Sequence, residues 1–429
     1  MPKCCRGLAA ALASVFILGP APARAAGFAI FEQGARGMGF AGAFTAQAND
    51  PSAIFHNAAG IAFLKGKQIY LGGTLIHPSS TFTGADPFPG AAVTEKADVG
   101  LLTPPAAYYT QQFTERLVFG IGLHTPFGLT TQWANPDTFS GRFLSEKAVL
   151  KGFSLNPTVA YKLADRFAVG GGVDVRFSSV SLERRVPVIN PFTQKVTDAA
   201  SVTLDSNTDV AVGFNVGALA KITDSLSAGV HYRHKVQANY TGGAAFTPRP
   251  TGNAQLDARL AALLPSGRQP VTTAIEFPAL ASGGVAWING DWTFEADVDW
   301  YQWSTFRRLT ISFTDHPELS ENVVEDYKDT WQYRMGLERR LGEQFAVRGG
   351  YFFDQSPAPA ESVSPLLPDA DRNGFALGGT WKAGHFHADA AAWFLLSPAR
   401  STDGVQRDQY NGTYKSHAVT LGIFLGYSF

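Results

Sequence analysis

Few residues of this sequence stand at spacings that could make or break covalent bonds. The run GMGFAG at residues 37–42 has the G-x-G-x-x-G spacing of a dinucleotide-binding turn, but no strand precedes it and it opens no βαβ unit. His231 with His234, and His385 with His387, lack a third metal ligand at a sensible spacing. No G-x-S-x-G nucleophile elbow occurs. We therefore expect no enzyme, no metal site and no cofactor, and a function that resides in the fold.

The first 25 residues are typical of a secretory signal peptide. Lys3 and Arg6 precede an apolar run over residues 8–18, and a small-x-small cleavage pattern follows at residues 23–25. The apolar run is shorter than the roughly 20 residues that a spanning helix needs. Cleavage after Ala25 would leave a chain without cysteine, because both cysteines precede it. A secreted chain of this kind has neither disulfides nor cysteine-based metal or redox chemistry.

The composition favours strands over helices. Charged residues make up 17% of the chain and aromatic residues 12%, with 32 phenylalanines among them. No apolar run after the signal peptide reaches half of the roughly 20 residues of a membrane helix. Apolar residues that are abundant but never form a block must alternate with polar ones, which is the pattern of strands. The formal net charge of −1 gives no basic footprint, so no nucleic acid is expected as a partner.

The end of the chain shows this alternation most clearly. From Val419 to Phe429 every second residue is apolar, and the residues between them are mostly small or polar. Because successive side chains of a strand point to opposite faces, such a strand has a lipid face and a lumen face. The same pattern recurs at residues 166–178, 226–233, 292–300 and 331–338.

Fourteen strands are predicted, and their connections alternate in length. The predicted strands cover residues 67–77, 98–112, 115–125, 147–162, 166–186, 203–221, 225–240, 271–288, 291–305, 328–340, 344–354, 373–382, 385–397 and 413–429. Tight turns alternate with long, polar connections rich in Pro and Gly. An even strand number with short turns at one end and long loops at the other is typical of an outer-membrane β-barrel. Closure of the barrel also removes the strand edges that lipid would not tolerate.

Residues 26–65, between the cleavage site and the first strand, do not alternate. They are rich in Gly, Ala and Phe, a composition that suits a compact segment packed inside a lumen. Motifs here and further along resemble the FadL/TodX family of outer-membrane transporters of hydrophobic compounds. They are AGF (26–28), EQ (32–33), RGMG (36–39), NDPS (49–52), YKDTW (327–331), FDQSPAP (353–359), LPDADR (367–372) and YKS (414–416). The resemblance covers the mature chain from end to end.

This resemblance implies an all-β fold, a 14-stranded antiparallel transmembrane barrel over residues 66–429 with residues 26–65 as a hatch inside the lumen. It implies uptake of hydrophobic compounds, with long-chain fatty acids as the expected substrates. Ligand would be captured among extracellular loops, transferred beside the hatch and released laterally at a kinked third strand. The protein would lie in the outer membrane of a Gram-negative bacterium, among its lipids and lipopolysaccharide, after assembly by the barrel-assembly machinery through Phe429.

The resemblance also points to site residues. The hatch residues expected beside the ligand are Phe28, Ile30, Phe31 and Asn57. The family's plug usually carries Asn-Pro-Ala, whereas Ala58 follows Asn57 here, and loss of the proline frees a backbone dihedral.

The third strand contains Gly120, Gly122 and Pro126. An irregularity is plausible there because Gly and Pro weaken ladder pairing, although Pro126 and Gly128 could simply begin the loop.

Other residues have two interpretations. The loops at 126–146 and 241–270 carry apolar side chains that could capture ligand or pack the loops together. Arginines at 166, 176, 334 and 348 are expected in the lumen, where they would form ion-pair networks that hold the hatch or pair with a ligand carboxylate. A general porin for polar solutes and an outer-membrane lipid hydrolase are the alternative functions. The first requires an open lumen, and the second a Ser–His pair.

Overall fold

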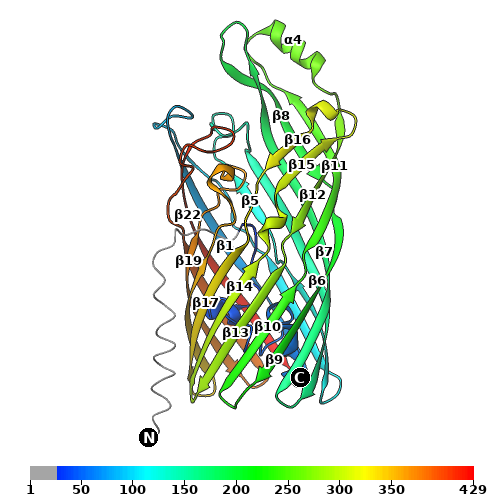
Figure 1. The fold of residues 1–429 in the computed structure, drawn as a ribbon, viewed down its shortest axis with the longest axis vertical. Helices are drawn as coiled ribbons and strands as arrows, with labels where there is room; N and C mark the ends of the chain where they lie inside the picture. Colours follow the sequence, from blue (N-terminus) through cyan, green and yellow to red (C-terminus); the bar gives the residue numbers. More distant parts are fainter. Residues whose placement is uncertain (1–26) are drawn as a thin grey trace.

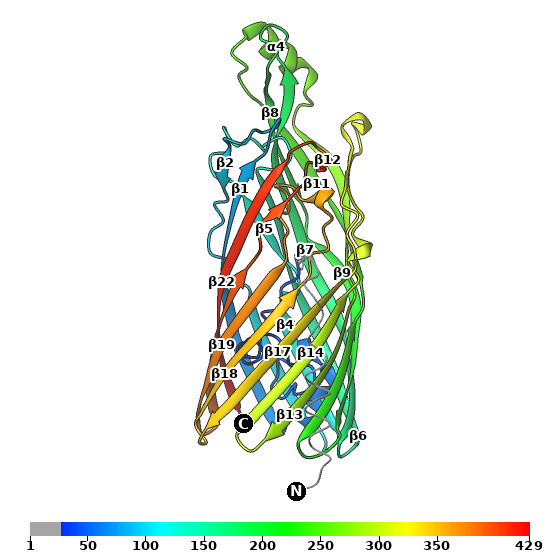
Figure 2. The same ribbon diagram turned by 60° about the vertical axis from the view of Figure 1, so that its left-hand side comes forward.

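A closed barrel of antiparallel strands makes up most of the molecule (Figures 1 and 2). The computed structural model describes residues 27–429, so the predicted signal peptide lies outside the described residues. Fourteen strands pair in turn, and β22 closes the barrel on β1 in a ladder from Gln68↔Ser428 to Gly84↔Gly412. The predicted 14-stranded barrel is confirmed.

Eight of the fourteen strands are interrupted, which gives 22 strand segments in all. The segments are β1 (Lys67–Gly84), β2 (Thr94–Lys96), β3 (Pro105–Gln112), β4 (Leu117–His124), β5 (Leu129–Gln132), β6 (Lys147–Ala164), β7 (Phe167–Ile189), β8 (Val196–Ser206), β9 (Asp209–Lys221), β10 (Leu226–Arg233), β11 (Val236–Pro248), β12 (Arg268–Phe277), β13 (Leu280–Asn289), β14 (Trp292–Tyr301), β15 (Arg308–Phe313), β16 (Glu321–Val324), β17 (Thr330–Leu341), β18 (Phe345–Asp354), β19 (Arg372–Ala383), β20 (Phe386–Leu396), β21 (Arg400–Ser401) and β22 (Gly412–Ser428).

Helices are few and short. They are α2 (Ala35–Gly39), α3 (Ala53–His56), η2 (Ala58–Phe63), α4 (Ala254–Leu263), η3 (Trp303–Thr305), η4 (Pro317–Leu319) and η5 (Ala360–Ser362). Helix α4 lies at the tip of the long-loop end in Figure 1. None of the helices within residues 27–429 has both the length and the apolar character needed to cross a membrane.

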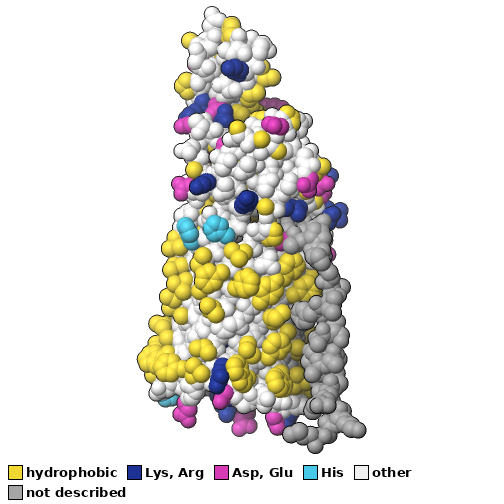
Figure 3. Space-filling model, turned by 90° about the vertical axis from the view of Figure 1, so that its left-hand side faces the viewer, with side chains coloured by type: hydrophobic (Ala, Val, Ile, Leu, Met, Phe, Trp, Pro, Cys, Tyr) yellow, Lys and Arg dark blue, Asp and Glu magenta, His cyan; other side chains and the backbone are white. Residues whose placement is uncertain are grey.

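The outer wall carries an apolar belt, as the alternation predicts. On β22, Leu421, Ile423 and Leu425 are exposed, whereas Thr420 and Phe424, which point inward, are fully buried. Figure 3 shows hydrophobic side chains gathered around the lower half of one face, with charged side chains above and below them. This arrangement matches the hydrocarbon layer of a membrane between its two polar interfaces.

Residues 27–66, here called the N-terminal segment, lie inside the barrel. In Figures 1 and 2 the segment lies within the lower part of the barrel. Its helices α2, α3 and η2 are buried almost completely. Small residues on the barrel wall make room for it: an ideal Cβ on Gly217 would lie 2.2 Å from Asn57 Oδ1, and one on Gly170 would lie 2.6 Å from the carbonyl of Ala58. The lumen is therefore packed with protein at this level.

Candidate functional site

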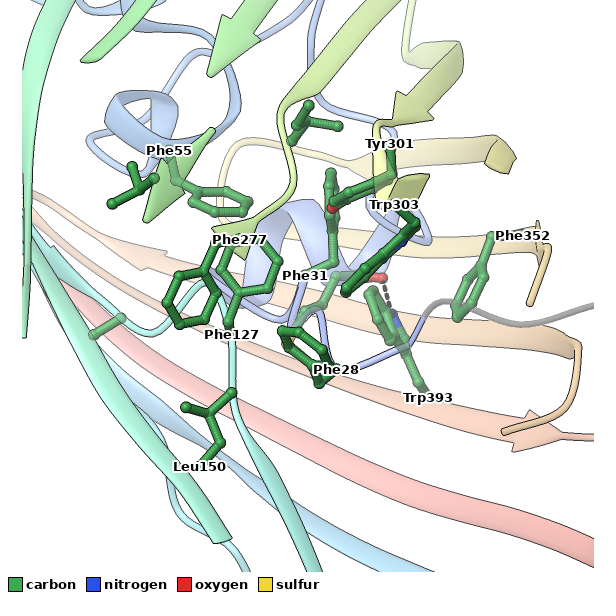
Figure 4. Packing of buried hydrophobic residues seen from close by; sticks show 14 of the residues in the cluster. Phe28, Phe31, Phe55, Phe127, Leu150, Phe277, Tyr301, Trp303, Phe352 and Trp393 are labelled. Atoms are coloured by element: carbon green, nitrogen blue, oxygen red, sulfur yellow. Dashed lines mark hydrogen bonds between the residues drawn. The ribbon is translucent and has the colours of Figure 1, made fainter. Parts of the chain in front are cut away.

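Phe28 lies at the centre of an aromatic cluster (Figure 4). Its ring is only 5% exposed and makes edge-to-face contacts with four others. The centroid distances are 6.0 Å to Phe127, 6.1 Å to Phe277, 4.7 Å to Trp303 and 5.5 Å to Phe306. These partners come from the third strand, the end of β12 and the connection after β14. The barrel thus gathers rings from three parts of the chain around one N-terminal side chain.

The same N-terminal residues pair with the third strand at its interruption. The third strand consists of β4 and β5, separated by residues 125–128. The Ile30 N–H donates to the Pro126 carbonyl at 2.9 Å, and the Gly128 N–H donates to the Phe28 carbonyl at 3.0 Å. Ala29 and Phe127 form an antiparallel bridge between these bonds. The interruption therefore exchanges hydrogen bonds with the N-terminal segment.

A gap separates the second strand (β2 and β3, residues 94–112) from the third. Below it, β3 and β4 pair up to Ala107↔Leu123. Above it, the Asp98 N–H donates to the Gln132 carbonyl at 2.7 Å, and Ala97 bridges to Trp133. In the described structure no backbone hydrogen bond joins residues 99–105 to residues 125–131. The wall is thus open between two closed stretches.

A cavity of about 560 Å³ borders this gap. We call it the lateral cavity. The N-terminal residues Gly27–Ile30 line it together with residues of the loop 355–372. On the two sides of the gap it is lined by Val99, Leu102, Thr103, Pro104 and Pro105, and by Thr125, Gly128, Leu129, Thr130 and Thr131. One cavity thus borders both the start of the N-terminal segment and the gap in the wall.

A smaller cavity, of about 80 Å³, lies in the upper lumen, and we call it the luminal cavity. Its lining is almost wholly apolar. The lining residues are Phe28, Leu129, Ala148, Val149, Leu150, Val180, Ser181, Leu182, Leu204, Thr273, Ile275, Phe306, Leu309, Ile311, Glu325, Leu366 and Leu367. Phe28, Leu129, Leu150 and Leu367 line both cavities, so Phe28 stands between them.

The other predicted hatch residues lie in different surroundings. Ile30 lines the lateral cavity. Phe31 packs on Phe55 at 5.4 Å and lies under the Arg334 guanidinium at 3.9 Å, and neither cavity includes it. Asn57 donates to the carbonyls of Thr45 and Ala218 and accepts from the Ala59 N–H, so it fixes the turn before η2. The structure thus places Phe28 and Ile30 at a cavity and Phe31 and Asn57 in the packing beneath.

Gly120 and Gly122 do not form the irregularity of the third strand. Both pair regularly within β4. Their missing side chains leave space for Ile54 of the N-terminal segment, which would lie 2.8 Å and 3.0 Å from an added Cβ. The interruption begins after His124 and includes Pro126, which has no N–H for a ladder. The strand resumes at β5, so Pro126 and Gly128 lie within the strand's course rather than at the start of a loop.

Carboxylates on β14 hold the middle of the N-terminal segment. Asp297 Oδ2 accepts from the backbone N–H groups of Phe44 at 2.8 Å and Thr45 at 2.9 Å. Glu295 Oε1 accepts from those of Ala46 at 2.6 Å and Gln47 at 3.2 Å. Four consecutive amides thus meet two buried acids.

The lumen arginines serve the same packing. Arg176 and Arg233 both bond to Asp174, at 3.0 Å and 2.7 Å. Arg334 bonds to Asp299 at 2.7 Å and donates to the Ala41 carbonyl at 2.9 Å.

Arg348 bonds to Glu338 at 2.6 Å. The expectation for Arg166 was wrong: its side chain is 53% exposed at a turn and pairs with Asp224, because it precedes the strand rather than lying within it.

The loop 355–372 contributes to the lining of the lateral cavity. Ser356 Oγ donates to Asp369 at 2.5 Å, and Arg372 lies 3.8 Å from the same carboxyl. Burial raises the pKa of Asp369 to about 7, although Arg372 and the Ser356 hydrogen bond oppose the shift. Arg372 also donates to the Gly27 carbonyl at 3.1 Å, which ties this loop to the start of the N-terminal segment.

Sequence reasoning did not find several residues of the site. Phe277, Trp303, Phe306 and Leu150 surround Phe28, yet their positions lie 122 or more residues beyond it in the sequence. Trp303 and Phe306 lie in and just after η3, where the alternation of β14 ends. A break in alternation within a predicted strand was the available signal. No local sequence pattern around Glu325 predicts that it lines the luminal cavity.

These features define a membrane-type β-barrel with an N-terminal segment in its lumen and an apolar cavity beside it. Residues 17–429 match the protein family described as "Outer membrane protein transport protein (OMPP1/FadL/TodX)". The chain therefore belongs to this family of transporters of hydrophobic compounds in the Gram-negative outer membrane, as the sequence motifs predict.

Relatives support this assignment over the full length. The 47 kDa outer membrane protein of Pasteurella multocida is 26% identical and the alignment covers 97% of both chains. The long-chain fatty acid transport protein of Escherichia coli strain CFT073 is 23% identical over 98% of both. Among solved structures, a Pseudomonas aeruginosa FadL homologue matches with a TM-score of 0.82 and 20% identity. The match covers 94% of this chain and 100% of the homologue. The Pseudomonas putida toluene transporter TodX matches with a TM-score of 0.69 and 18% identity. The match covers 93% of this chain and 99% of the TodX chain.

Proposed function

We propose that the protein takes up hydrophobic compounds, long-chain fatty acids among them, by a path that leaves the barrel sideways. Ligand is captured among the extracellular loops and enters the luminal cavity. It passes Phe28 into the lateral cavity and leaves through the gap between the second and third strands. The observation that carries this proposal is that Phe28 lines both cavities and is bonded through its carbonyl to the third strand beside the gap.

The physical reason lies in solvation. The free energy of an apolar solute falls when its surface is removed from water. Pockets that bind such solutes are mostly apolar and carry few polar groups. The luminal cavity meets that description. Lateral release into the membrane keeps such a solute out of the aqueous periplasm, whereas passage straight through the N-terminal segment would have to displace its buried carboxylate and arginine contacts.

A substitution at the gap tests the route. Leu102 lines the lateral cavity on the second strand, so Leu102→Trp should block the gap and lower uptake of a radiolabelled fatty acid or alkane several-fold in a transport-deficient host. Leu377→Trp is the matched control, because Leu377 is 62% exposed on the lipid face of β19 and borders neither cavity. Equal uptake by both variants and the parent chain would contradict lateral release.

The two alternatives have direct assays. A general porin predicts steady ion conductance in a planar bilayer, whereas a lumen filled by residues 27–66 predicts little conductance. A lipid hydrolase predicts turnover of a fluorogenic ester that one Ser→Ala change abolishes, and we expect no such turnover. Within residues 27–429 no serine hydroxyl is hydrogen-bonded to a histidine ring.

A further inference from the structure

Two polar side chains in the mostly apolar lining of the luminal cavity each have a buried oxygen atom without a hydrogen-bond partner among residues 27–429. Glu325 follows β16 and is only 2% exposed. Its Oε2 atom and the Oγ1 atom of Thr273 on β12 are both buried, and neither has a hydrogen-bond partner among residues 27–429. Both residues line the luminal cavity. Buried polar atoms are nearly always paired, and a ligand oxygen in the luminal cavity would lie beside both residues.

The surroundings of Glu325 favour its uncharged form. Desolvation by burial is the main cause that raises its pKa, to about 8. The charged groups that act on it are Arg407, Asp408, Asp369 and Asp326, and three of these four are acids. The one cation, Arg407, is bonded to Asp326 at 2.7 Å. At neutral pH the side chain is therefore a carboxylic acid, with one O–H to donate and oxygen atoms to accept.

No cation lines the luminal cavity in the part of the chain that the structure describes. A ligand carrying an ionised carboxylate would lose its hydration there without gaining a counter-charge, which is strongly unfavourable. A hydrocarbon would fit the apolar wall but would leave both polar atoms unpaired. A ligand with an uncharged oxygen satisfies both the wall and the polar atoms. The lining therefore favours a compound with an uncharged oxygen over a hydrocarbon and over an ionised carboxylate.

We propose that Glu325 and Thr273 bind the oxygen of a neutral, oxygenated hydrophobic compound: an alcohol, a carbonyl compound or a fatty acid in its un-ionised form. This inference rests on the proposed function, because it assigns the substrate class of the same path. Glu325 donates its O–H to the ligand oxygen, and Thr273 adds a second donor. The small volume of the cavity suits the oxygenated end of the ligand, and the remaining chain extends toward Phe28 and the lateral cavity.

Two probes of equal length separate the polar contribution from the apolar one. Radiolabelled 2-dodecanone accepts hydrogen bonds and donates none, and n-dodecane does neither. Binding is measured by equilibrium dialysis of the full-length barrel in nanodiscs at pH 6.5. We expect Glu325→Leu to weaken binding of the ketone about tenfold and Thr273→Val about threefold, with n-dodecane unchanged or slightly stronger. Glu325→Gln keeps a donor and should retain most of the ketone affinity.

The pH dependence supplies a second test. In the parent chain the affinity for 2-dodecanone should fall about tenfold between pH 6.5 and pH 9.5, because the donor proton is lost as Glu325 ionises. In Glu325→Gln it should stay constant. The shift in migration on SDS gels between unheated and heated samples checks that every variant is folded. Equal ketone affinity in the parent chain and Glu325→Leu would overturn the inference. If neither probe binds or is taken up, the proposed function itself fails.

Discussion

Replacing Phe28 with alanine is expected to release the start of the N-terminal segment while leaving the barrel closed. The phenylalanine ring is buried and touches four other rings. Truncation of such a core ring costs about 3–5 kcal/mol, because the transfer energy is lost and a cavity remains. The barrel ladder does not depend on this side chain. The loss should therefore fall on the local contact between the N-terminal segment and the third strand.

Hydrogen exchange of two backbone amides measures how far Phe28→Ala loosens the contact between the N-terminal segment and the third strand. The N–H groups of Ile30 and Gly128 are held by the hydrogen bonds on either side of the Ala29–Phe127 bridge. A loss of about 3 kcal/mol in local stability corresponds to about 100-fold more frequent opening, since about 1.4 kcal/mol is a factor of ten. Hydrogen exchange of these two amides should accelerate by that factor. The same variant should bind hydrophobic probes more weakly and change their uptake.

Phe352→Ala is the matched control. Phe352 is as buried as Phe28 and packs on Trp393 at 4.8 Å, but it lines neither cavity. Its truncation should leave the exchange of the Ile30 and Gly128 amides within about threefold of the parent chain. If Phe28→Ala left exchange, binding and uptake unchanged, Phe28 would have no gating role and the reasoning from its two cavities would be refuted.

Three further changes probe the lumen and the loop above it. Asp297→Ala should leave two amides of the N-terminal segment unpaired, at a cost of about 1–3 kcal/mol for each buried group, and raise ion conductance; Asp291→Ala, at an exposed turn, should not. Because the pKa of Asp369 is raised to about 7, the protection of its loop from hydrogen exchange should fall as pH rises from about 4 to 7 and then level off; Asp369→Asn should remove that dependence. Gly217→Val should expel η2 from the wall and lower the yield of folded barrel, whereas Gly379→Val, which meets only one atom at 3.4 Å, should be tolerated.

The sequence was sufficient to predict the barrel wall because the wall obeys a local rule. The residues of β22 alternate between lipid and lumen with period two, so each side chain's face follows from its neighbours. The placement of residues 27–66 in the lumen follows less directly, from composition and motifs. The motifs could not separate Phe28, at a cavity, from Asn57, which caps a turn.

The rest of the site depends on closure of the barrel. Trp303 and Phe277 meet Phe28 because the N-terminal segment lies inside the barrel, where it contacts inward-facing side chains from much later in the sequence. No local pattern specifies such a meeting. Glycines in the third strand suggested an irregularity, but a glycine keeps its N–H and C=O in the ladder, while Pro126 lacks the N–H.

The hydrogen bonds from the N-terminal segment to β14 have a consequence for biogenesis. Phe44 precedes Asp297 by 253 residues, so the amides that emerge early in synthesis find their acceptors only when most of the barrel exists. Contacts of such sequence separation form late, because the chain between them must first be ordered. The empty barrel is therefore the expected intermediate, and the last event of maturation is the docking of the N-terminal segment. A precursor trapped before that event would be a leaky pore, and its cost to the cell would be permeability rather than loss of uptake.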